Sequence, residues 1–315
     1  MTLRSGESMN MHAENTIDLS HLVLSAQKIA LLPNAERIIK VKSNRWIGYT
    51  RACQALEKLE DLLSCPNRQR MQNMLLIGPT NNGKSMIIEC FYRKHMRYTS
   101  EDQTQEIIPV LVMQMPSDPS IGRFYTMLLY ALGVPAIGQR MRLSDIELLA
   151  LRLMKVTNVQ MLIIDELHNM LAGGSKVRSE FLNLLRFLGN ELRIPIIGAG
   201  TEDAYRAVRT DDQLENRFNP FILSRWKDDK EFLMLLASFE ASIPLRKQSH
   251  LYNEDMARYI IARTEGTIGE IATLLTRTAI VAINSGEESM NARAFSQADY
   301  EGPTVRRRRF EREMV

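Results

Sequence analysis

The residues Gly78-Pro-Thr-Asn-Asn-Gly83-Lys84-Ser85 match the pattern GxxxxGK[ST], which surrounds the phosphates of a bound nucleotide. Glycines permit positive φ angles, so the loop amides and the amino end of the next helix can point at the anion. Lys84 would add positive charge at the β- and γ-phosphates, and the Ser85 hydroxyl would bind Mg²⁺. The alternative is a glycine turn with a surface lysine. The expected nucleotide contacts from this loop are Gly78, Pro79, Thr80, Asn81, Asn82, Gly83, Lys84, Ser85 and Met86.

Asp165 and Glu166 end the apolar run Met161 to Ile164, which is typical of a buried strand. Open α/β sheets bind ligands at the carboxyl ends of their strands, so these two acids would face the phosphate loop. Asp165 would hold Mg²⁺ through water, and Glu166 would orient and polarise an attacking water molecule. Two acids at a strand end can also cap a helix or face solvent. We predict Mg²⁺-dependent hydrolysis of ATP, with Lys84 and Glu166 as catalytic residues.

A further polar residue, Thr201, follows the short apolar run Ile196-Ile-Gly-Ala-Gly. In a sheet of this type its hydroxyl would sense the γ-phosphate through the attacking water. An N-cap for the helix that begins at Glu202 is an equally open role, and the two roles do not exclude each other. His168 and Asn169 extend the acidic motif. We expect these two side chains to face a loop rather than to take part in catalysis.

Short apolar runs, which are too short for helices, are expected to form strands buried on both faces. They are residues 74–77, 108–113, 161–164 and 194–197, with 221–223 as a candidate fifth. Helical patterns occupy residues 50–63, 85–95, 124–132, 144–155 and 179–192. This alternation predicts an α/β fold with a five-stranded parallel sheet sandwiched by helices. Three later helical patterns predict a small C-terminal helical lid: 228–241, 253–264 and 269–284.

The composition is that of an ordinary globular protein. The 315 residues are 45% hydrophobic and 24% charged, and the net charge of +3 is only mildly basic. The three cysteines lack metal-binding spacing, and no apolar run approaches the roughly 18 residues of a membrane span. We therefore expect a cytoplasmic protein without a membrane partner. The expected divisions are a flexible N-terminal extension 1–33, a helical, adenine-proximal segment 34–66, an ATPase core 67–224, a helical lid 225–300 and a basic C-terminal tail 301–315.

Several segments together resemble the TniB and TnsC transposition regulators, which are AAA+ P-loop NTPases. The resemblance covers about residues 34–290. It rests on the phosphate loop, Leu162-Ile-Ile-Asp-Glu166, Gly200-Thr201, Arg45-Trp46-Ile47 with Tyr49, and Leu214-Glu-Asn-Arg217-Phe218. It implies an ATP-dependent homo-oligomer, as a ring or a helical filament, that assembles on double-stranded DNA. A transposase and a target-selection protein similar to TniQ are the implied protein partners.

The same resemblance assigns roles to residues outside the phosphate loop. Arg217 would be a catalytic arginine finger that reaches the γ-phosphate of the neighbouring subunit, a contribution of about 10³ to 10⁵ in rate in P-loop enzymes. Its alternative is a solvated helix charge. Glu270 stands where many AAA+ proteins carry a sensor arginine, which leaves the coupling of lid to nucleotide open. Three residues would lie near the adenine, with core packing as their alternative: Trp46, Ile47 and Tyr49.

DNA contacts are expected, by the same resemblance, from arginines beside Gly122 and Gly138, which permit close approach to phosphates. These residues are Arg123, Arg140 and Arg142. Ordinary solvated surface arginines are the alternative. The run Arg306 to Arg309 would clamp DNA or a partner, or belong to a disordered tail.

The leading hypothesis is a regulator of DNA transposition that oligomerises on target DNA with ATP and recruits a transposase, with hydrolysis resetting the assembly. One alternative is an IstB-like protein or helicase loader, whose partner is a replicative helicase. Another is a passive scaffold that ATP clamps on DNA with negligible turnover. The string Asp165-Glu-Leu-His168 is also shared with DExH helicases, but no second nucleotide-binding core follows it in this sequence.

Overall fold

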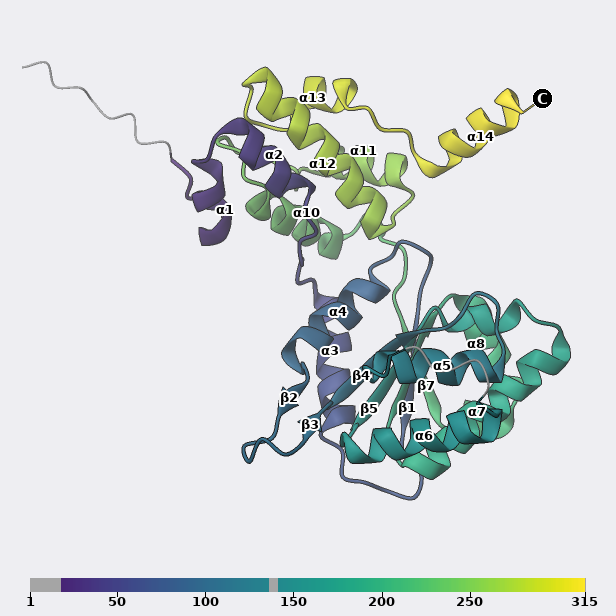
Figure 1. Ribbon diagram of the computed structural model, residues 1–315. Coiled ribbons are helices and arrows are strands. Elements are labelled where there is room, and N and C mark those ends of the chain that lie inside the picture. Colours follow the sequence, from purple (N-terminus) through teal and green to yellow (C-terminus); the bar gives the residue numbers. More distant parts are fainter. Residues whose placement is uncertain (1–17, 136–140, 315) are drawn as a thin grey trace, which may run out of the picture.

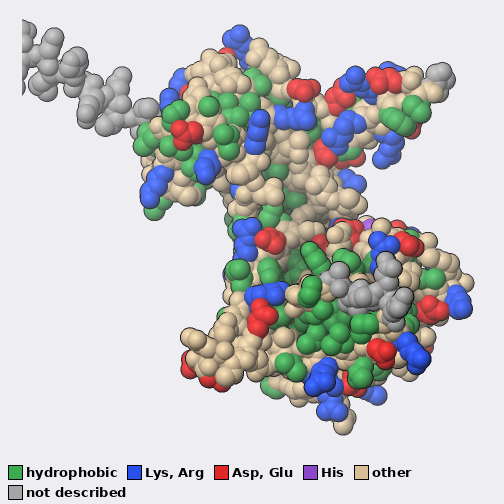
Figure 2. Space-filling model, in the orientation of Figure 1, with side chains coloured by type: hydrophobic (Ala, Val, Ile, Leu, Met, Phe, Trp, Pro, Cys, Tyr) green, Lys and Arg blue, Asp and Glu red, His purple; other side chains and the backbone are tan. Residues whose placement is uncertain are grey.

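The computed structural model describes residues 18–135 and 141–314. They form two bodies, one built around a β-sheet and one entirely helical, with a narrow waist between them (Figures 1 and 2). In the described residues no single helix is long and apolar enough to cross a membrane. Two successive helices, α11 (Glu254–Thr264) and α12 (Ile268–Ser285), have together the length and apolar composition of a membrane span, although neither has them alone. The chain bends by 113° between them.

Five parallel strands form the central sheet, in the order β4-β5-β6-β1-β7. Their bounds are β1 Asn73–Ile77, β4 Val110–Gln114, β5 Met161–Asp165, β6 Ile196–Gly200 and β7 Phe218–Ile222. β6 pairs with β1 on one side and with β5 on the other, so the ends of these three strands meet at one edge. The predicted five-stranded parallel sheet is therefore confirmed.

Helices cover both faces of the sheet because the strand side chains alternate and are apolar on both sides. Met74 and Leu76 of β1 pack with α3 (Thr50–Leu63) and α4 (Lys84–Lys94). Leu75 and Ile77 point the other way, into a core shared with helices on the opposite face. Those helices are α5 Ile121–Ala131, α6 Leu143–Val156, α7 Ser175–Leu192 and α8 Glu202–Val208.

Four short elements complete the sheet body. A 3₁₀ helix, η1 (Leu167–Leu171), follows β5, and α9 (Asp212–Glu215) precedes β7. A separate two-stranded hairpin joins β2 (Tyr98–Thr99) to β3 (Glu106–Ile107). The sequence patterns predicted none of these elements, because each is too short to show a repeating pattern of apolar residues.

The helical body contains the predicted lid together with two helices from the amino-terminal part of the chain. Its lid helices are α10 Lys230–Ser242, α11, α12 and α13 Ala292–Gln297. α2 (Asn34–Lys42) buries Val41 in the lid core, and α1 (Leu24–Ala30) is anchored by the Val23 amide, which donates to the Ala241 carbonyl.

Two expectations about domain organisation are wrong. Residues 24–30 of the expected flexible extension are helical, because Ala26 and Ala30 are buried; residues 1–17 lie outside the described residues. The segment 34–66 is divided between the two bodies, since α2 joins the lid and α3 joins the core. For the basic C-terminal tail the sequence left a clamp and a disordered segment open; residues 303–313 form the helix α14 (Pro303–Glu313), which contradicts the second alternative.

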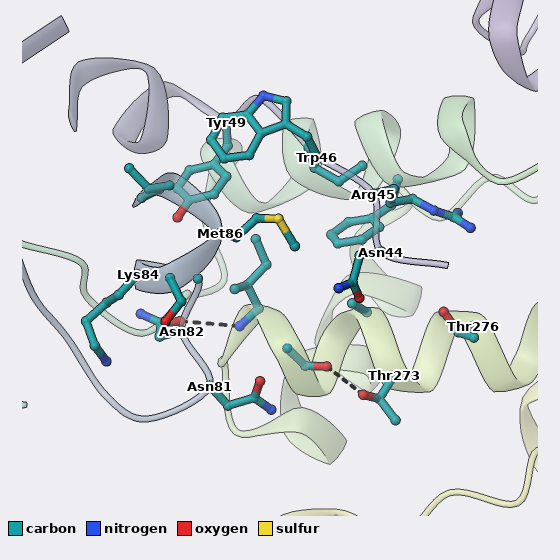
Figure 3. Close-up of a pocket in the computed structure, with 18 of the residues that line it drawn as sticks. Asn44, Arg45, Trp46, Tyr49, Asn81, Asn82, Lys84, Met86, Thr273 and Thr276 are labelled. Carbon is teal, nitrogen blue, oxygen red and sulfur yellow. Dashed lines mark hydrogen bonds between the residues drawn. The ribbon is translucent and has the colours of Figure 1, made fainter. Parts of the chain in front are cut away.

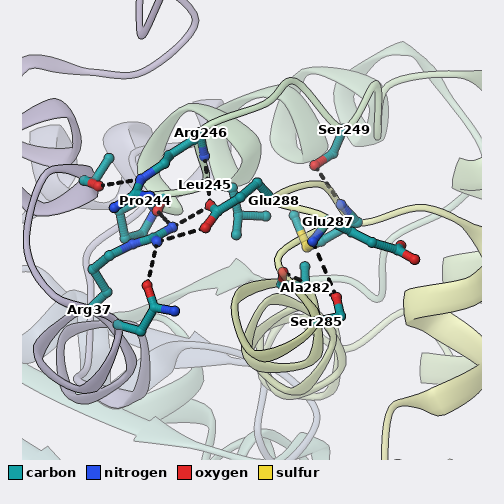
Figure 4. Close-up of polar contacts among 12 residues, drawn as sticks. Arg37, Pro244, Leu245, Arg246, Ser249, Ala282, Ser285, Glu287 and Glu288 are labelled. Carbon is teal, nitrogen blue, oxygen red and sulfur yellow. Dashed lines mark hydrogen bonds and ion pairs between the residues drawn. The ribbon is translucent and has the colours of Figure 1, made fainter. Parts of the chain in front are cut away.

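A buried ion pair fixes α2 to the lid (Figure 4). Arg37 is fully buried, and its guanidinium donates to both carboxylate oxygens of Glu288 at 2.8 and 2.5 Å. It also donates to the Pro244 carbonyl at 2.9 Å and to Asn34 Oδ1 at 3.1 Å. Burial acts to raise the pKa of Glu288, but the hydrogen bonds and charge of Arg37 outweigh it and hold that pKa below its ordinary value.

Replacing Arg37 with alanine is expected to lower the free energy of unfolding by about 3 to 5 kcal/mol, because it leaves the Glu288 carboxylate buried without its partner. Denaturant unfolding at neutral pH measures this loss. The pKa of Glu288 is depressed in the fold, so its contribution is complete above the unfolded pKa of about 4.3 and is lost on further acidification. Lys40→Ala, on the exposed side of α2, is the matched control. Equal stability of the two variants would contradict the assigned role.

Candidate functional site

The phosphate loop lies between β1 and α4, as the motif requires, and its backbone needs glycine at both ends. A Cβ on Gly78 would lie 2.8 Å from the carbonyl oxygen of Leu223, which is too close for any side chain. Gly83 has a φ of +85°, a conformation that other residues seldom adopt. α4 begins directly after it, so the free amides at the amino end of this helix face the loop. The local backbone thus has the features of an anion site.

Lys84 lies inside the loop, where only 5% of its surface is exposed. Its Nζ donates to the carbonyl oxygens of Gly78 at 2.9 Å and Pro79 at 2.8 Å. Burial lowers the pKa of Lys84, while the negative charges of Glu166 and Asp165 oppose that shift. The ammonium group is therefore held beside the acidic pair, and phosphate oxygens would replace the two carbonyls as stronger acceptors.

The structure brings Ser85 and Asp165 together across the sheet edge. The Ser85 hydroxyl donates to Asp165 Oδ2 at 2.6 Å, and the Glu166 amide donates to Asp165 Oδ1 at 2.8 Å. A hydroxyl and a carboxylate are oxygen ligands that suit Mg²⁺. No cluster of three or more His, Cys, Asp or Glu side chains suited to a metal occurs in the described residues. The residues therefore fit a Mg²⁺ ion that takes its other ligands from water and phosphate.

Glu166 follows β5 in a left-handed conformation, with a φ of +54°. Its Oε2 lies 3.1 Å from Nε2 of His168, so His168 contacts the acid instead of merely facing a loop. Thr201 follows β6, the strand between β1 and β5. Its side chain makes no capping hydrogen bond to α8, and its buried Oγ1 has no partner among the described residues. A buried hydroxyl of this kind normally finds a partner, which a bound water or ligand would supply.

A cavity of about 610 Å³ extends from the phosphate loop into the space between the two bodies (Figure 3). Trp46, Ile47 and Tyr49, which are expected near the adenine, line its wall. They also take part in packing: Ile47 belongs to the lid core, and Tyr49 meets Trp226 edge-on at 5.1 Å. Burial raises the pKa of Tyr49 to about 12, which keeps its phenol neutral.

The lid supplies the opposite wall of the cavity, which sequence reasoning missed. Residues of α12 line it at helical spacing: Ile268, Gly269, Ala272, Thr273, Thr276, Arg277 and Ile280. The run of small residues at positions 269, 272, 273 and 276 was the only signal of a close approach on that face. The Gly269 amide donates to the Asn81 carbonyl at 3.0 Å, and a Cβ at Gly269 would collide with the Asn81 side chain. α12 therefore lies directly on the phosphate loop.

Asn82 forms a second contact between loop and lid. Its Nδ2 donates to the carbonyls of Leu223 at 2.9 Å and Ser224 at 3.1 Å, and its Oδ1 accepts the Ile268 amide at 3.3 Å. The arginine that the lid contributes to the cavity wall is Arg277, which pairs with Asp299 at 3.2 Å. No sequence signal distinguished it from a surface arginine.

Comparison with known families identifies the chain. Residues 37–228, more than half of its length, match the family model described as the bacterial TniB protein. The chain belongs to the TniB family. This confirms the resemblance inferred from the motifs. No curated protein matches the sequence.

Solved structures of other proteins share the fold of this chain. The ORC2 protein of Aeropyrum pernix, in ADPNP-ADP complexes, is 16% identical, with a TM-score of 0.60 over 82% of this chain and 70% of that one. A chain of Drosophila ORC bound to DNA is 14% identical, with a TM-score of 0.53 over 95% and 70% of the two chains. These likenesses, with the sheet order, establish the AAA+ P-loop fold.

Arg217 lies far from the phosphate loop of the same chain. It directly precedes β7, whose first residue pairs with Asn73, the first residue of β1. The phosphate loop follows the other end of β1, about 16 Å away for strands of this length. Arg217 is partly exposed, and its guanidinium donates to Asn190 Oδ1 at 2.8 Å. Its guanidinium is therefore remote from a nucleotide bound in the phosphate loop of the same subunit.

Two of the three expected DNA-binding arginines lie close together, and the third, Arg140, lies outside the described residues. Arg123 is in the first turn of α5, and Arg142 directly precedes α6. A Cβ on Gly122 would lie 3.8 Å from Leu143, which shows that the beginnings of these helices are adjacent. Both arginines are exposed, and Arg123 forms a loose ion pair with Asp118 at 3.4 Å.

Lys84→Ala is expected to weaken the binding of ATP by at least about tenfold, because it removes charge-assisted hydrogen bonds to the phosphates. Titration with a fluorescent ATP analogue measures the change. Lys94→Ala at the exposed far end of α4 is the matched control and should bind as the wild type does. Unchanged affinity in the Lys84 variant would exclude this loop as the nucleotide site.

Proposed function

We propose that this TniB-family protein is an ATP-hydrolysing regulator of DNA transposition. In this proposal it assembles with ATP into a homo-oligomer on double-stranded DNA and recruits a transposase and a TniQ-like target-selection protein. Hydrolysis then resets the assembly. Family membership supports the setting in transposition, and the contact of Ser85 with Asp165 supports the chemistry.

The contact between Ser85 and Asp165 is the observation that carries the proposal. It supports a single site at the carboxyl edge of the sheet, with Ser85 and Asp165 as the proposed metal ligands and Glu166 beside them. Lys84 holds the β- and γ-phosphates, and Glu166 accepts the proton of a water molecule that attacks the γ-phosphate. Bound Mg²⁺ would neutralise charge on the β- and γ-phosphates. Thr201, whose buried hydroxyl has no hydrogen-bond partner in the described part of the chain, positions the attacking water.

Arg217 completes the site of a neighbouring subunit in this proposal. Its place at the opposite edge of the sheet excludes action in its own subunit but suits a contact across an interface. A positive charge supplied in trans stabilises the charge that develops on the γ-phosphate during transfer. Hydrolysis would then depend on assembly, and DNA that promotes assembly would stimulate it.

Glu166→Gln is expected to lower the rate of ATP hydrolysis by about 10²-fold or more, because the amide cannot accept the proton of the attacking water. ATP binding should persist, so the variant accumulates in the ATP-bound, DNA-associated state. Phosphate release under saturating ATP and duplex DNA measures turnover. Glu57→Gln on the exposed side of α3 is the control. Normal turnover in the Glu166 variant would contradict the catalytic assignment, and negligible turnover in the wild type would favour the passive scaffold.

DNA binding is proposed for the surface formed by the beginnings of α5 and α6. Arg123 and Arg142 are exposed, carry flexible cationic side chains and belong to helices that begin near the same edge as the nucleotide site. Contacts of arginine with backbone phosphates fix position and register but carry little sequence preference. Repetition of this surface around an oligomer would therefore give strong binding with weak sequence selectivity.

The double variant Arg123→Ala, Arg142→Ala is expected to weaken ATP-dependent binding to a duplex and to reduce the slope of log K against log salt by about 1.8, because each binding unit would neutralise two fewer phosphates. Fluorescence anisotropy at several salt concentrations gives that slope. Arg152→Ala, on the exposed side of α6, is the control. If duplex binding is indifferent to ATP and to the double substitution, the protein is not a DNA scaffold of the proposed kind; stimulation of a replicative helicase would favour a loader.

A further inference from the structure

Glu270 connects the phosphate loop to the C-terminal helix α14. It lies in the first turn of α12, with 9% of its surface exposed. Its Oε1 accepts a hydrogen bond from Arg306 of α14 at 2.7 Å, and its Oε2 accepts one from Tyr300 at 2.8 Å. The same Oε1 is 3.5 Å from Nδ2 of Asn81 in the phosphate loop. One carboxylate thus contacts both the phosphate loop, at Asn81, and the C-terminal segment, at Tyr300 and Arg306.

The first turn of α14 is held firmly against the lid. Gly302 packs on the carbonyl oxygen of Arg263 so closely that no side chain would fit there. Glu265 then accepts hydrogen bonds from the amide and hydroxyl of Thr304 at 2.8 and 2.6 Å. Arg306 follows on the same side and reaches Glu270. The beginning of the helix therefore has a defined position relative to α12.

The rest of α14 stands clear of both bodies (Figures 1 and 2). None of its residues is buried. Within the described residues, Arg309 pairs with Glu301 and Glu313, which are close by in the chain. Arg306 is consequently the residue of α14 whose side chain connects this exposed helix with the nucleotide site.

We propose that the Arg306–Glu270 ion pair is a link through which α14 sets the affinity of the phosphate loop for nucleotide. Arg306 and Glu270 are positioning residues in this proposal, since they act through Asn81. The proposal rests on the ATP binding proposed above. It also gives the glutamate at position 270 a function other than that of a sensor arginine.

The physical basis is compensation of charge near the triphosphate. Glu270 carries a negative charge in a nearly buried position behind Asn81, where it would repel the anionic nucleotide. Arg306 offsets this charge, and the hydrogen bonds of Arg306 and Tyr300 fix the carboxylate beside the loop. Without Arg306 the buried carboxylate of Glu270 would lack its ionic partner. Its uncompensated charge would then repel ATP, and Asn81 would no longer be held in the position that suits ATP binding.

The link also makes α14 a point of control. The side chain of Arg306 is 49% exposed, so an anionic group docked on α14 can compete with Glu270 for the guanidinium. A ligand that draws Arg306 away lowers the affinity for nucleotide, and bound nucleotide opposes that ligand to the same degree, because coupling between sites is reciprocal.

Titration of the full chain with a fluorescent ATP analogue, without DNA, tests the link. Arg306→Ala should weaken binding by about fivefold or more, the lower range of coupling between sites. Arg306→Lys should restore part of the affinity, because it retains the charge. Arg308→Ala on the same helix is the matched control, since Arg308 has no ion pair within the described part of the chain. In ATPase assays Arg306→Ala should raise KM while kcat at saturation stays near the wild-type value.

Glu270→Gln provides the decisive comparison, because it removes the charge that Arg306 offsets. In that background Arg306→Ala should no longer change the affinity. Additive effects in the double variant, or equal affinities of the Arg306→Ala and Arg308→Ala variants, would overturn the link. If the wild type itself fails to bind ATP, the proposed function fails. If the wild type binds ATP, Lys84→Ala does not and Arg306→Ala binds normally, only the link is wrong.

Discussion

The contact between the Ser85 hydroxyl and the Asp165 carboxylate is the constraint on which the site depends. It joins the helix that follows β1 to the end of β5, two strands that are separated in the sheet by β6. Only a parallel arrangement with this order brings the phosphate loop, the acidic pair and Thr201 to the same edge. The buried, apolar strands hold these few polar groups in place, since both faces of the sheet are covered by helices.

Local patterns are enough to predict the sheet and the chemical groups at its edge. The phosphate loop and the acidic pair are contiguous motifs, and most strands are continuous apolar runs. The bounds of β6 show the limit: the apolar run 194–197 begins two residues before the strand, whereas the run Ile196-Ile-Gly-Ala-Gly that precedes Thr201 matches it. Gly198 is needed in this strand because Leu75 and Leu167 occupy the space that a side chain would take.

Interactions between distant segments cannot be predicted from local patterns. α2 looks like an isolated polar helix, yet Arg37 finds its partner Glu288 at the far end of the lid. The wall that α12 adds to the cavity depends on the lid reaching back to Asn81. In the sequence Glu270 is recognisable only as a departure from a family pattern, and its meaning requires the position of Arg306. In each case the missing information is the three-dimensional partner of a charged or small residue.

The construction of the helical body from both ends of the chain has a consequence for biosynthesis. The ribosome delivers α1 and α2 first, then the whole sheet body, and only afterwards the lid helices that cover Val41 and neutralise Arg37. Because domains fold as units while the chain emerges, the sheet body can form before its lid exists. During most of translation, therefore, Arg37 lacks its ionic partner and the apolar face of the amino-terminal helices stays exposed.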